Sequence, residues 1–111
     1  MLLNVFERLL LRNIVPQIQG WNYAHMKEAR ELMEGLFTEQ EESDLQFEQE
    51  GTQVKWKVAK EDGSPIPQER DIPVPDGLKA KIGKFLKQLD KEERLEFTHM
   101  SLYGKFVEPA S

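Results

Sequence analysis

Residues 45–58 decide the fold, and they read LQFEQEGTQVKWKV. Apolar and polar residues alternate with a period of two on both sides of Gly51, as expected of strands with one buried face. Two such runs around Glu50-Gly51-Thr52 predict an antiparallel β-hairpin, because glycine adopts the backbone angles of a tight turn. A hairpin alone is marginally stable in water, so we expect helices to cover its apolar face, with Trp56 in the core.

Helical spacing and capping residues flank this hairpin on both sides. The first predicted helix covers residues 4–14, where Asn4 and Glu7 form a capping box, and Pro16 ends it. A second helix is predicted from Asn22 to Gly35, and a short third one over 39–44 is capped by Thr38. A fourth helix is predicted over 77–89 and is capped by Asp76. The last one is capped by Thr98 and buries Met100, Tyr103, Phe106 and Val107.

The segment 60–76 is predicted to be a loop, because it holds four of the six prolines. Within it, Ile72 and Val74 alternate and indicate a third, edge strand near 71–74, where proline is tolerated. Residues 108–111 are expected to be a frayed tail. The fold class is therefore α+β in a single domain over 1–111, with about four helices packed on a small antiparallel sheet.

Composition narrows the class of protein. The 111 residues include no Cys, which excludes disulfides, thiolate zinc sites and iron–sulfur clusters. No basic, apolar leader opens the chain, and no run approaches the ~20 apolar residues of a membrane span. We therefore expect a soluble cytoplasmic protein that has no membrane partner.

Charge is unevenly distributed along the chain. The net charge is −5, from 15 Lys and Arg against 20 Asp and Glu. Nine acidic residues and one basic residue lie between Glu28 and Glu50, whereas Lys79–Lys91 holds five Lys and one Asp. Direct nucleic-acid binding is not expected, because phosphate contacts need a basic surface. The lysines match the solvated face of an amphipathic helix.

No set of residues indicates catalysis, a metal or a cofactor. His25 and His99 are the only imidazoles, and no Cys or further His completes a three- or four-ligand site. The serines lack a nucleophile elbow, and the glycines form no phosphate-binding loop. We predict a protein that is not an enzyme and that uses no cofactor.

Two groups of residues are candidates for protein binding. One is the acidic group Glu39, Glu41, Glu42 and Asp44, which could present negative charge to a basic partner; the alternative is a solvated helix start. The other is Trp21 with Tyr23, which could be interface anchors or a lid on a small core.

Several segments resemble small, mostly uncharacterised accessory proteins of tailed phages and prophages. The segments are Asn4-Val5-Phe6-Glu7-Arg8-Leu9, Ile14-Val15-Pro16, Phe37-Thr38-Glu39-Gln40-Glu41-Glu42, Gln49-Glu50-Gly51-Thr52-Gln53-Val54-Lys55-Trp56, Leu86-Lys87-Gln88-Leu89-Asp90-Lys91-Glu92-Glu93 and Ser101-Leu102-Tyr103-Gly104-Lys105-Phe106-Val107-Glu108. They span most of the chain, and none is a catalytic signature. The loop from Gly63 to Pro75 is longer in this chain than in those phage proteins. The resemblance implies an accessory phage protein in a bacterial cytoplasm, with no site residues carried over.

Three hypotheses for function follow. The first is a non-catalytic protein-binding module, phage-encoded, that acts as an accessory or inhibitory protein on a host or phage protein. The second is a structural or assembly factor that self-associates, or joins a virion, through open strand edges. The third is a small metal-dependent enzyme.

Overall fold

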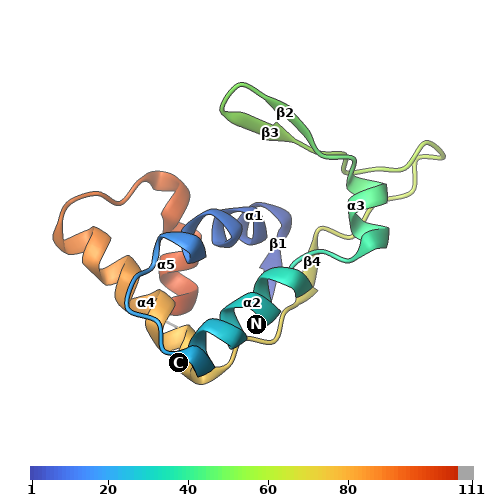
Figure 1. Cartoon of the computed structure of the whole chain (residues 1–111). Helices are drawn as coiled ribbons and strands as arrows, with labels where there is room; N and C mark the ends of the chain where they lie inside the picture. The colour runs from blue at the N-terminus through green and yellow to red at the C-terminus, as the bar shows by residue number, and fades with distance from the viewer. Residues whose placement is uncertain (108–111) are drawn as a thin grey trace.

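The computed structural model describes residues 1–107, which form five α-helices and two small antiparallel sheets (Figure 1). The predicted α+β class is confirmed, and the predicted tail 108–111 lies outside the described residues. In chain order the elements are β1 (Leu2–Asn4), α1 (Val5–Ile14), the 3₁₀ turn η1 (Val15–Gln17), α2 (Tyr23–Gly35), α3 (Glu39–Leu45), β2 (Glu48–Glu50), β3 (Gln53–Lys55), β4 (Glu69–Asp71), α4 (Asp76–Lys91), the 3₁₀ turn η2 (Phe97–His99) and α5 (Met100–Phe106).

The first three helices begin at the predicted capping residues. In α1 the Asn4 side chain accepts from the Glu7 amide, and the Glu7 carboxylate accepts from the Asn4 amide. Asn22 accepts from the His25 amide at the start of α2, and Thr38 with Glu41 forms a second capping box at α3. These bonds satisfy amides that would otherwise lack partners in the first turn of each helix.

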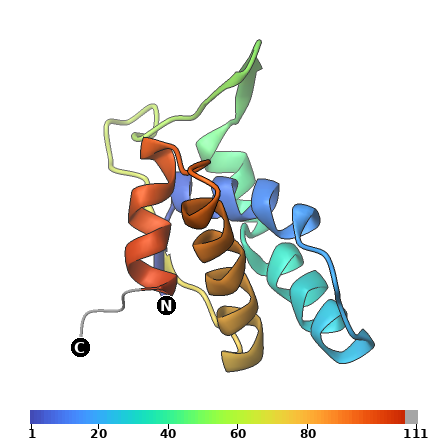
Figure 2. The same cartoon turned by 90° about the vertical axis from the view of Figure 1, so that its left-hand side faces the viewer.

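The predicted hairpin forms, but helices do not cover it. β2 pairs with β3 in the register Glu48↔Lys55, Gln49↔Val54 and Glu50↔Gln53, and Gly51 adopts a positive φ of 61° in the turn. All six strand residues are exposed, and the hairpin projects away from α2, α4 and α5 (Figures 1 and 2). Trp56 is half-buried at the base of the hairpin, so its predicted place in the core is only partly right.

Aromatic contacts hold the base of the hairpin. The rings of Phe37 and Phe47 meet edge to face with centroids 5.1 Å apart, and Phe47 meets Trp56 at 6.5 Å. The Trp56 indole also donates to the side-chain oxygen of Gln68 at 3.0 Å. The hairpin is therefore anchored at its base, while its strands stay exposed.

The third strand forms two residues earlier than the predicted range near 71–74, and it belongs to a second sheet and not to that of the hairpin. β4 covers Glu69–Asp71, before the prolines, and pairs with β1 in the register Leu3↔Arg70. Ile72 is buried next to β4, and its amide donates to the Met1 carbonyl. Pro73 and Pro75 lack amide donors, so strand pairing ends where they begin.

The last helices differ from the prediction at their starts. The N-cap of α4 is Pro75, which makes no side-chain cap, and Asp76 is already helical. The 3₁₀ turn η2 precedes α5, and the N-cap of η2 is Glu96, whereas Thr98 was predicted to cap the last helix. In α5, Leu102 and Phe106 are buried, while Met100 is 69% exposed. The predicted stripe is wrong at Met100 because that residue begins the helix at the surface.

One hydrophobic core lies between α1, α2, α4, α5 and the β1–β4 sheet. Figure 2 shows α5, α4 and α2 side by side, with the hairpin projecting beyond them. The fully buried apolar side chains come from these elements, from the residue after α2 and from the end of α3, and they include Leu3, Leu11, Leu36, Leu45, Leu78, Ile82, Leu86 and Leu102.

Candidate protein-binding groove

The two predicted groups of binding residues lie at opposite ends of α2. Trp21 and Tyr23 flank its start, and α3, which carries the acidic group, follows its end. A helix of the length of α2 is roughly 20 Å long, so the groups do not form one surface. Tyr23 is 83% exposed, whereas Trp21 is half-buried beneath Lys81, whose Nζ lies 5.1 Å from the indole centroid.

Within the acidic group, Glu41 faces inward. One carboxylate oxygen accepts from Nη1 of Arg8 at 2.6 Å, and the other accepts from Nε of Arg70 at 3.0 Å. Only 18% of the Glu41 side chain is exposed, and the Arg8 side chain is fully buried. Glu41 is therefore an internal counter-ion, and Glu39 and Glu42 remain on the outer surface with half-buried Asp44 beside them.

The same two guanidinium groups cap the end of α2. Arg8 donates to the Leu36 carbonyl at 2.9 Å, and Arg70 donates to the carbonyls of Gly35 and Leu36 at 2.7 and 3.0 Å. The last carbonyls of a helix carry partial negative charge, so cations are favoured there. Burial raises the pKa of Glu41, but the hydrogen bonds from Arg8 and Thr38 and the charges of both arginines bring the pKa below its ordinary value.

A second buried carboxylate, Glu7, joins α1 to α5. It accepts from the Ser101 hydroxyl and, at 2.7 Å, from Nζ of Lys105. Burial raises the pKa of Glu7, but the Asn4 amide, Lys105 and Ser101 together lower it below its ordinary value. A carboxylate with a lowered pKa is a weak proton acceptor, so this cluster is suited to fastening α5 and not to activating Ser101 as a nucleophile.

A large open hollow on the described surface was not predicted. Its floor is the outer face of α1, one wall is the hairpin, and Thr98 of η2 supplies the other wall. It encloses about 730 Å³ and is lined by Phe6, Leu9, Leu10, Asn13, Gln49, Thr52, Gln53, Val54, Trp56 and Thr98. We call it the α1–hairpin groove. A smaller hollow of about 470 Å³, which shares Leu9, Asn13, Gln49 and Val54, continues it toward Arg12.

Apolar side chains are exposed along this groove. Phe6 is 41% exposed and Val54 is 37% exposed, and Phe97, next to Thr98 in η2, is 91% exposed. The sequence signal for the groove is an excess of apolar residues on α1. Val5, Leu11 and Ile14 already supply a buried stripe, so Phe6, Leu9 and Leu10 form a second one.

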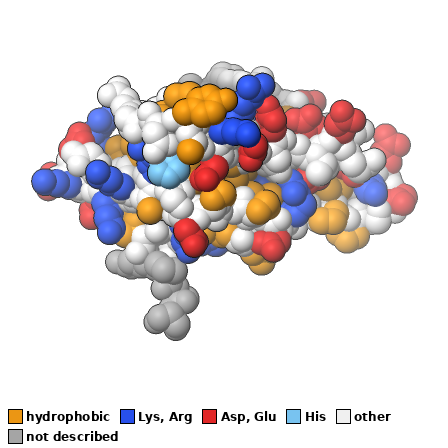
Figure 3. Space-filling view, turned by 60° about the horizontal axis from the view of Figure 1, so that its bottom comes forward, with side chains coloured by type: hydrophobic (Ala, Val, Ile, Leu, Met, Phe, Trp, Pro, Cys, Tyr) orange, Lys and Arg blue, Asp and Glu red, His pale blue; other side chains and the backbone are white. Residues whose placement is uncertain are grey.

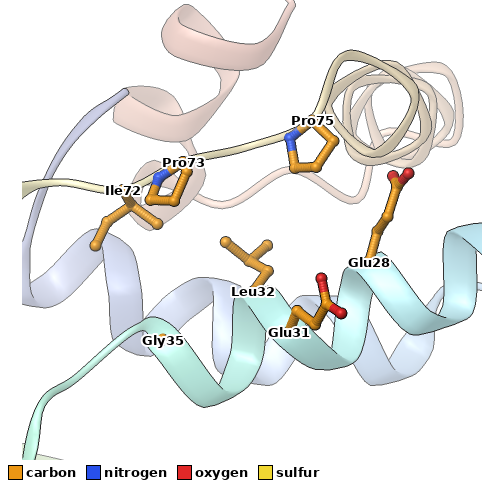
Figure 4. A pocket seen from close by; sticks show the side chains of 7 residues that line it. All are labelled: Glu28, Glu31, Leu32, Gly35, Ile72, Pro73 and Pro75. Atoms are coloured by element: carbon orange, nitrogen blue, oxygen red, sulfur yellow. The ribbon is translucent and has the colours of Figure 1, made fainter.

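A third hollow lies between α2 and the segment before α4 (Figure 4). It encloses about 150 Å³, with Glu28 and Glu31 on one side and Ile72, Pro73 and Pro75 on the other. The Glu28 carboxylate points toward the start of α4 in Figure 4, and its Oε2 is buried with no hydrogen-bond partner among the described residues. His25, three residues earlier, packs against Gly77, where a Cβ would lie 2.8 Å from its Nε2.

No group of three or more His, Asp or Glu side chains within residues 1–107 is arranged to hold a metal ion. In the same part of the chain, no helix is both long and apolar enough to cross a membrane. No protein family, curated protein or solved structure matches the chain.

Proposed function

We propose that the chain is a non-catalytic protein-binding module, a phage-encoded accessory or inhibitory protein that acts on a host or phage protein in the bacterial cytoplasm. The observation that supports this proposal is the open α1–hairpin groove. Its lining comes from α1, the hairpin and η2, and on α1 Phe6 is exposed while Leu9 and Leu10 are half-buried.

The composition of the groove fits a protein interface. Aromatic and aliphatic side chains at the centre of an interface contribute most of the binding free energy, and polar residues around them exclude water. Here Phe6, Val54 and Trp56 lie among the amides of Asn13, Gln49 and Gln53.

The charge distribution adds a preference for a basic partner. Residues 39–71 contain ten Asp and Glu and four Lys and Arg, a net charge of −6, so the rest of the chain carries +1. Acidic side chains predominate at the end where α3 lies, and basic side chains gather at the opposite end, where α4 lies (Figure 3). Such asymmetry speeds association with a partner of opposite charge and is reduced by salt.

A pull-down with matched variants tests the proposal. The tagged full chain is incubated with nuclease-treated bacterial lysate, and retained proteins are identified by mass spectrometry. Val54→Asp places a charge in the groove, whereas Val58→Asp places the same charge at a residue that is 63% exposed outside the groove lining. We expect a stoichiometric partner that Val54→Asp loses and Val58→Asp retains. A partner retained equally by both variants contradicts a role for the groove.

The second candidate is an assembly factor that self-associates, because both two-stranded sheets have open edges among the described residues. Light scattering over a hundredfold range of protein concentration distinguishes this assembly factor from the protein-binding module. A mass that rises with concentration supports self-association, and a constant monomer mass contradicts it.

A further inference from the structure

The outer edge of β3 is an open strand edge beside the groove. Within residues 1–107, β3 pairs with β2 and with no other strand. The Lys57 amide donates to the Leu45 carbonyl at 2.8 Å, on the side where β2 lies. Because successive amides of a strand point in opposite directions, the amides of Val54 and Trp56 are directed to the outer edge.

The chain itself already pairs along this edge a few residues later. The Ile66 amide donates to the Val58 carbonyl at 2.9 Å, and Ala59 forms an antiparallel bridge with Pro65. Residues 64–66 thus occupy the edge beyond Val58, and the part at Gln53–Trp56 is its open continuation. β3 also contributes more groove-lining residues than β2, which supplies Gln49 alone.

The side chains that line the larger hollow of the groove, of about 730 Å³, determine which kind of peptide segment can bind there. Although 32% of the chain is charged, the ten residues that line this hollow include no charged side chain. A charged segment would lose its hydration there without a counter-ion, so the lining selects an uncharged one. The amides of Asn13, Gln49 and Gln53 each offer both donors and an acceptor, which suit the free N–H and C=O groups of an extended backbone.

We infer that the groove binds an extended, uncharged apolar segment of the partner protein, which pairs with the outer edge of β3 as a third strand. This inference rests on the proposed function. Alternate side chains of the segment would point to Phe6, Leu9 and Leu10 on α1. A third strand also stabilises the hairpin, since three strands with an apolar face are stable where two are marginal. A bound helix would leave the β3 edge unpaired, because its backbone bonds are internal.

The test uses proline substitutions on the two edges of the hairpin. Val54→Pro removes the amide on the outer edge of β3, and Gln49→Pro removes the amide on the outer edge of β2, directly opposite. Proline is tolerated at such edge positions, and circular dichroism checks that both variants fold. The probe is a synthetic peptide, the most enriched member of a displayed library of random 12-mer peptides selected on the immobilised full chain.

We expect the selected peptides to carry an uncharged core rich in Val, Ile, Thr and aromatic residues. Binding of the probe should weaken about tenfold in Val54→Pro, the effect of one lost hydrogen bond, and less than about threefold in Gln49→Pro. Bound probe should also slow hydrogen exchange of the Val54 and Trp56 amides.

Equal effects of the two prolines, a helical or charged core in the selected peptides, or no enrichment would each overturn the inference. The lysate experiment distinguishes this failure from failure of the proposed function. A natural partner that is lost from Val54→Asp but kept by Val54→Pro leaves the protein-binding module intact and removes strand addition.

Discussion

At the scale of single residues, Arg8 lies in the least favourable environment for a charge. Its guanidinium is fully buried, and its nitrogens donate to Glu41 and to the carbonyls of Leu36 and Gln68. A buried charge is tolerated only when its hydrogen bonds and counter-ion are in place. Glu41 and Arg8 are therefore interdependent, and the corner between α2 and α3 is the place where they meet.

Glu41→Gln should strongly destabilise the fold. The amide keeps an acceptor for the Thr38 N–H but leaves Arg8 without a counter-ion. That loss costs about 3 kcal/mol in the free energy of unfolding.

The matched control is Glu42→Gln. Glu42 is exposed, and its Oε1 lies 3.8 Å from Nη2 of Arg12. An exposed pair of this kind contributes little, so the cost of Glu42→Gln should be below about 0.5 kcal/mol. Urea unfolding measures both variants, and equal losses would show that Arg8 does not need the charge of Glu41.

The lowered pKa values of Glu7 and Glu41 predict a dependence of stability on pH. In the unfolded chain these carboxyl groups have a pKa near 4.5, so the unfolded chain takes up protons before the folded chain does. The free energy of unfolding should therefore be highest above pH 4.5 and fall as the pH decreases through 4.5 toward the lower folded values.

Urea midpoints between about pH 7 and pH 3 measure this dependence. The double variant Glu7→Gln/Glu41→Gln should have a shallower slope, whereas Glu34→Gln, on the exposed end of α2, should keep the slope of the parent chain. An unchanged slope in the double variant would assign the dependence to other carboxyl groups.

At the scale of elements, α4 and α5 approach each other closely at Gly83. A Cβ at this position would lie 3.0 Å from the backbone oxygen of Phe106 and 4.0 Å from a methyl group of Val107. Phe106 is itself buried at the end of α5, and Lys105 beside it is held by Glu7. The absence of a side chain at Gly83 therefore permits this helix pair.

Gly83→Ala should lower the melting temperature although alanine favours helices. Ser101 and Lys105 fasten α5 to Glu7, so overpacking against its backbone costs about 1–3 kcal/mol, more than the ~1 kcal/mol gained in helix propensity. Gly104→Ala is the matched control, because no atom lies within 4 Å of a Cβ there, and it should raise the melting temperature. A rise in both variants would show that α5 can shift away from α4.

Elements with local signals were predictable from the sequence. Each capping box, at Asn4 and at Thr38, pairs residues within one helical turn, and the hairpin turn has a glycine, Gly51, at its positive-φ position. β1 was missed because so short a strand carries too little pattern, and its partner β4 lies in the second half of the chain. The acidic charge of α3 was visible, but the inward orientation of Glu41 depends on Arg8 and Arg70, which lie far from it in the sequence.

At the scale of the whole molecule, the chain is elongated. The radius of gyration is 14.9 Å, and the principal axes measure 45 × 33 × 30 Å. A compact domain of this length has a radius of gyration of about 13 Å. In Figure 1 one end of the molecule is α3 with the loop after β3 and the other is α4, and the hairpin projects between them as a separate arm. The α1–hairpin groove exists because this arm stands away from α1.

Amide hydrogen exchange should be faster in the hairpin arm than in the helical core. Amides of β2 and β3 should exchange within minutes through local opening, because the strands are short and exposed, whereas amides of α1 and α4 should exchange only on global unfolding. Mass spectrometry of peptic fragments over a day resolves the two classes. Equal protection of the hairpin and α1 would show that the arm is as rigid as the core.

The pairing of β1 with β4 also has a consequence for synthesis on the ribosome. Leu3 is made 67 residues before its partner Arg70. At usual elongation rates the delay is about 3–13 s. During that interval Arg8 at first has neither Glu41 nor the Gln68 carbonyl, and the apolar face of α1 has no sheet beneath it. The segment from Leu3 to Ile14 therefore stays without its long-range partners until residues 68–71 have been made.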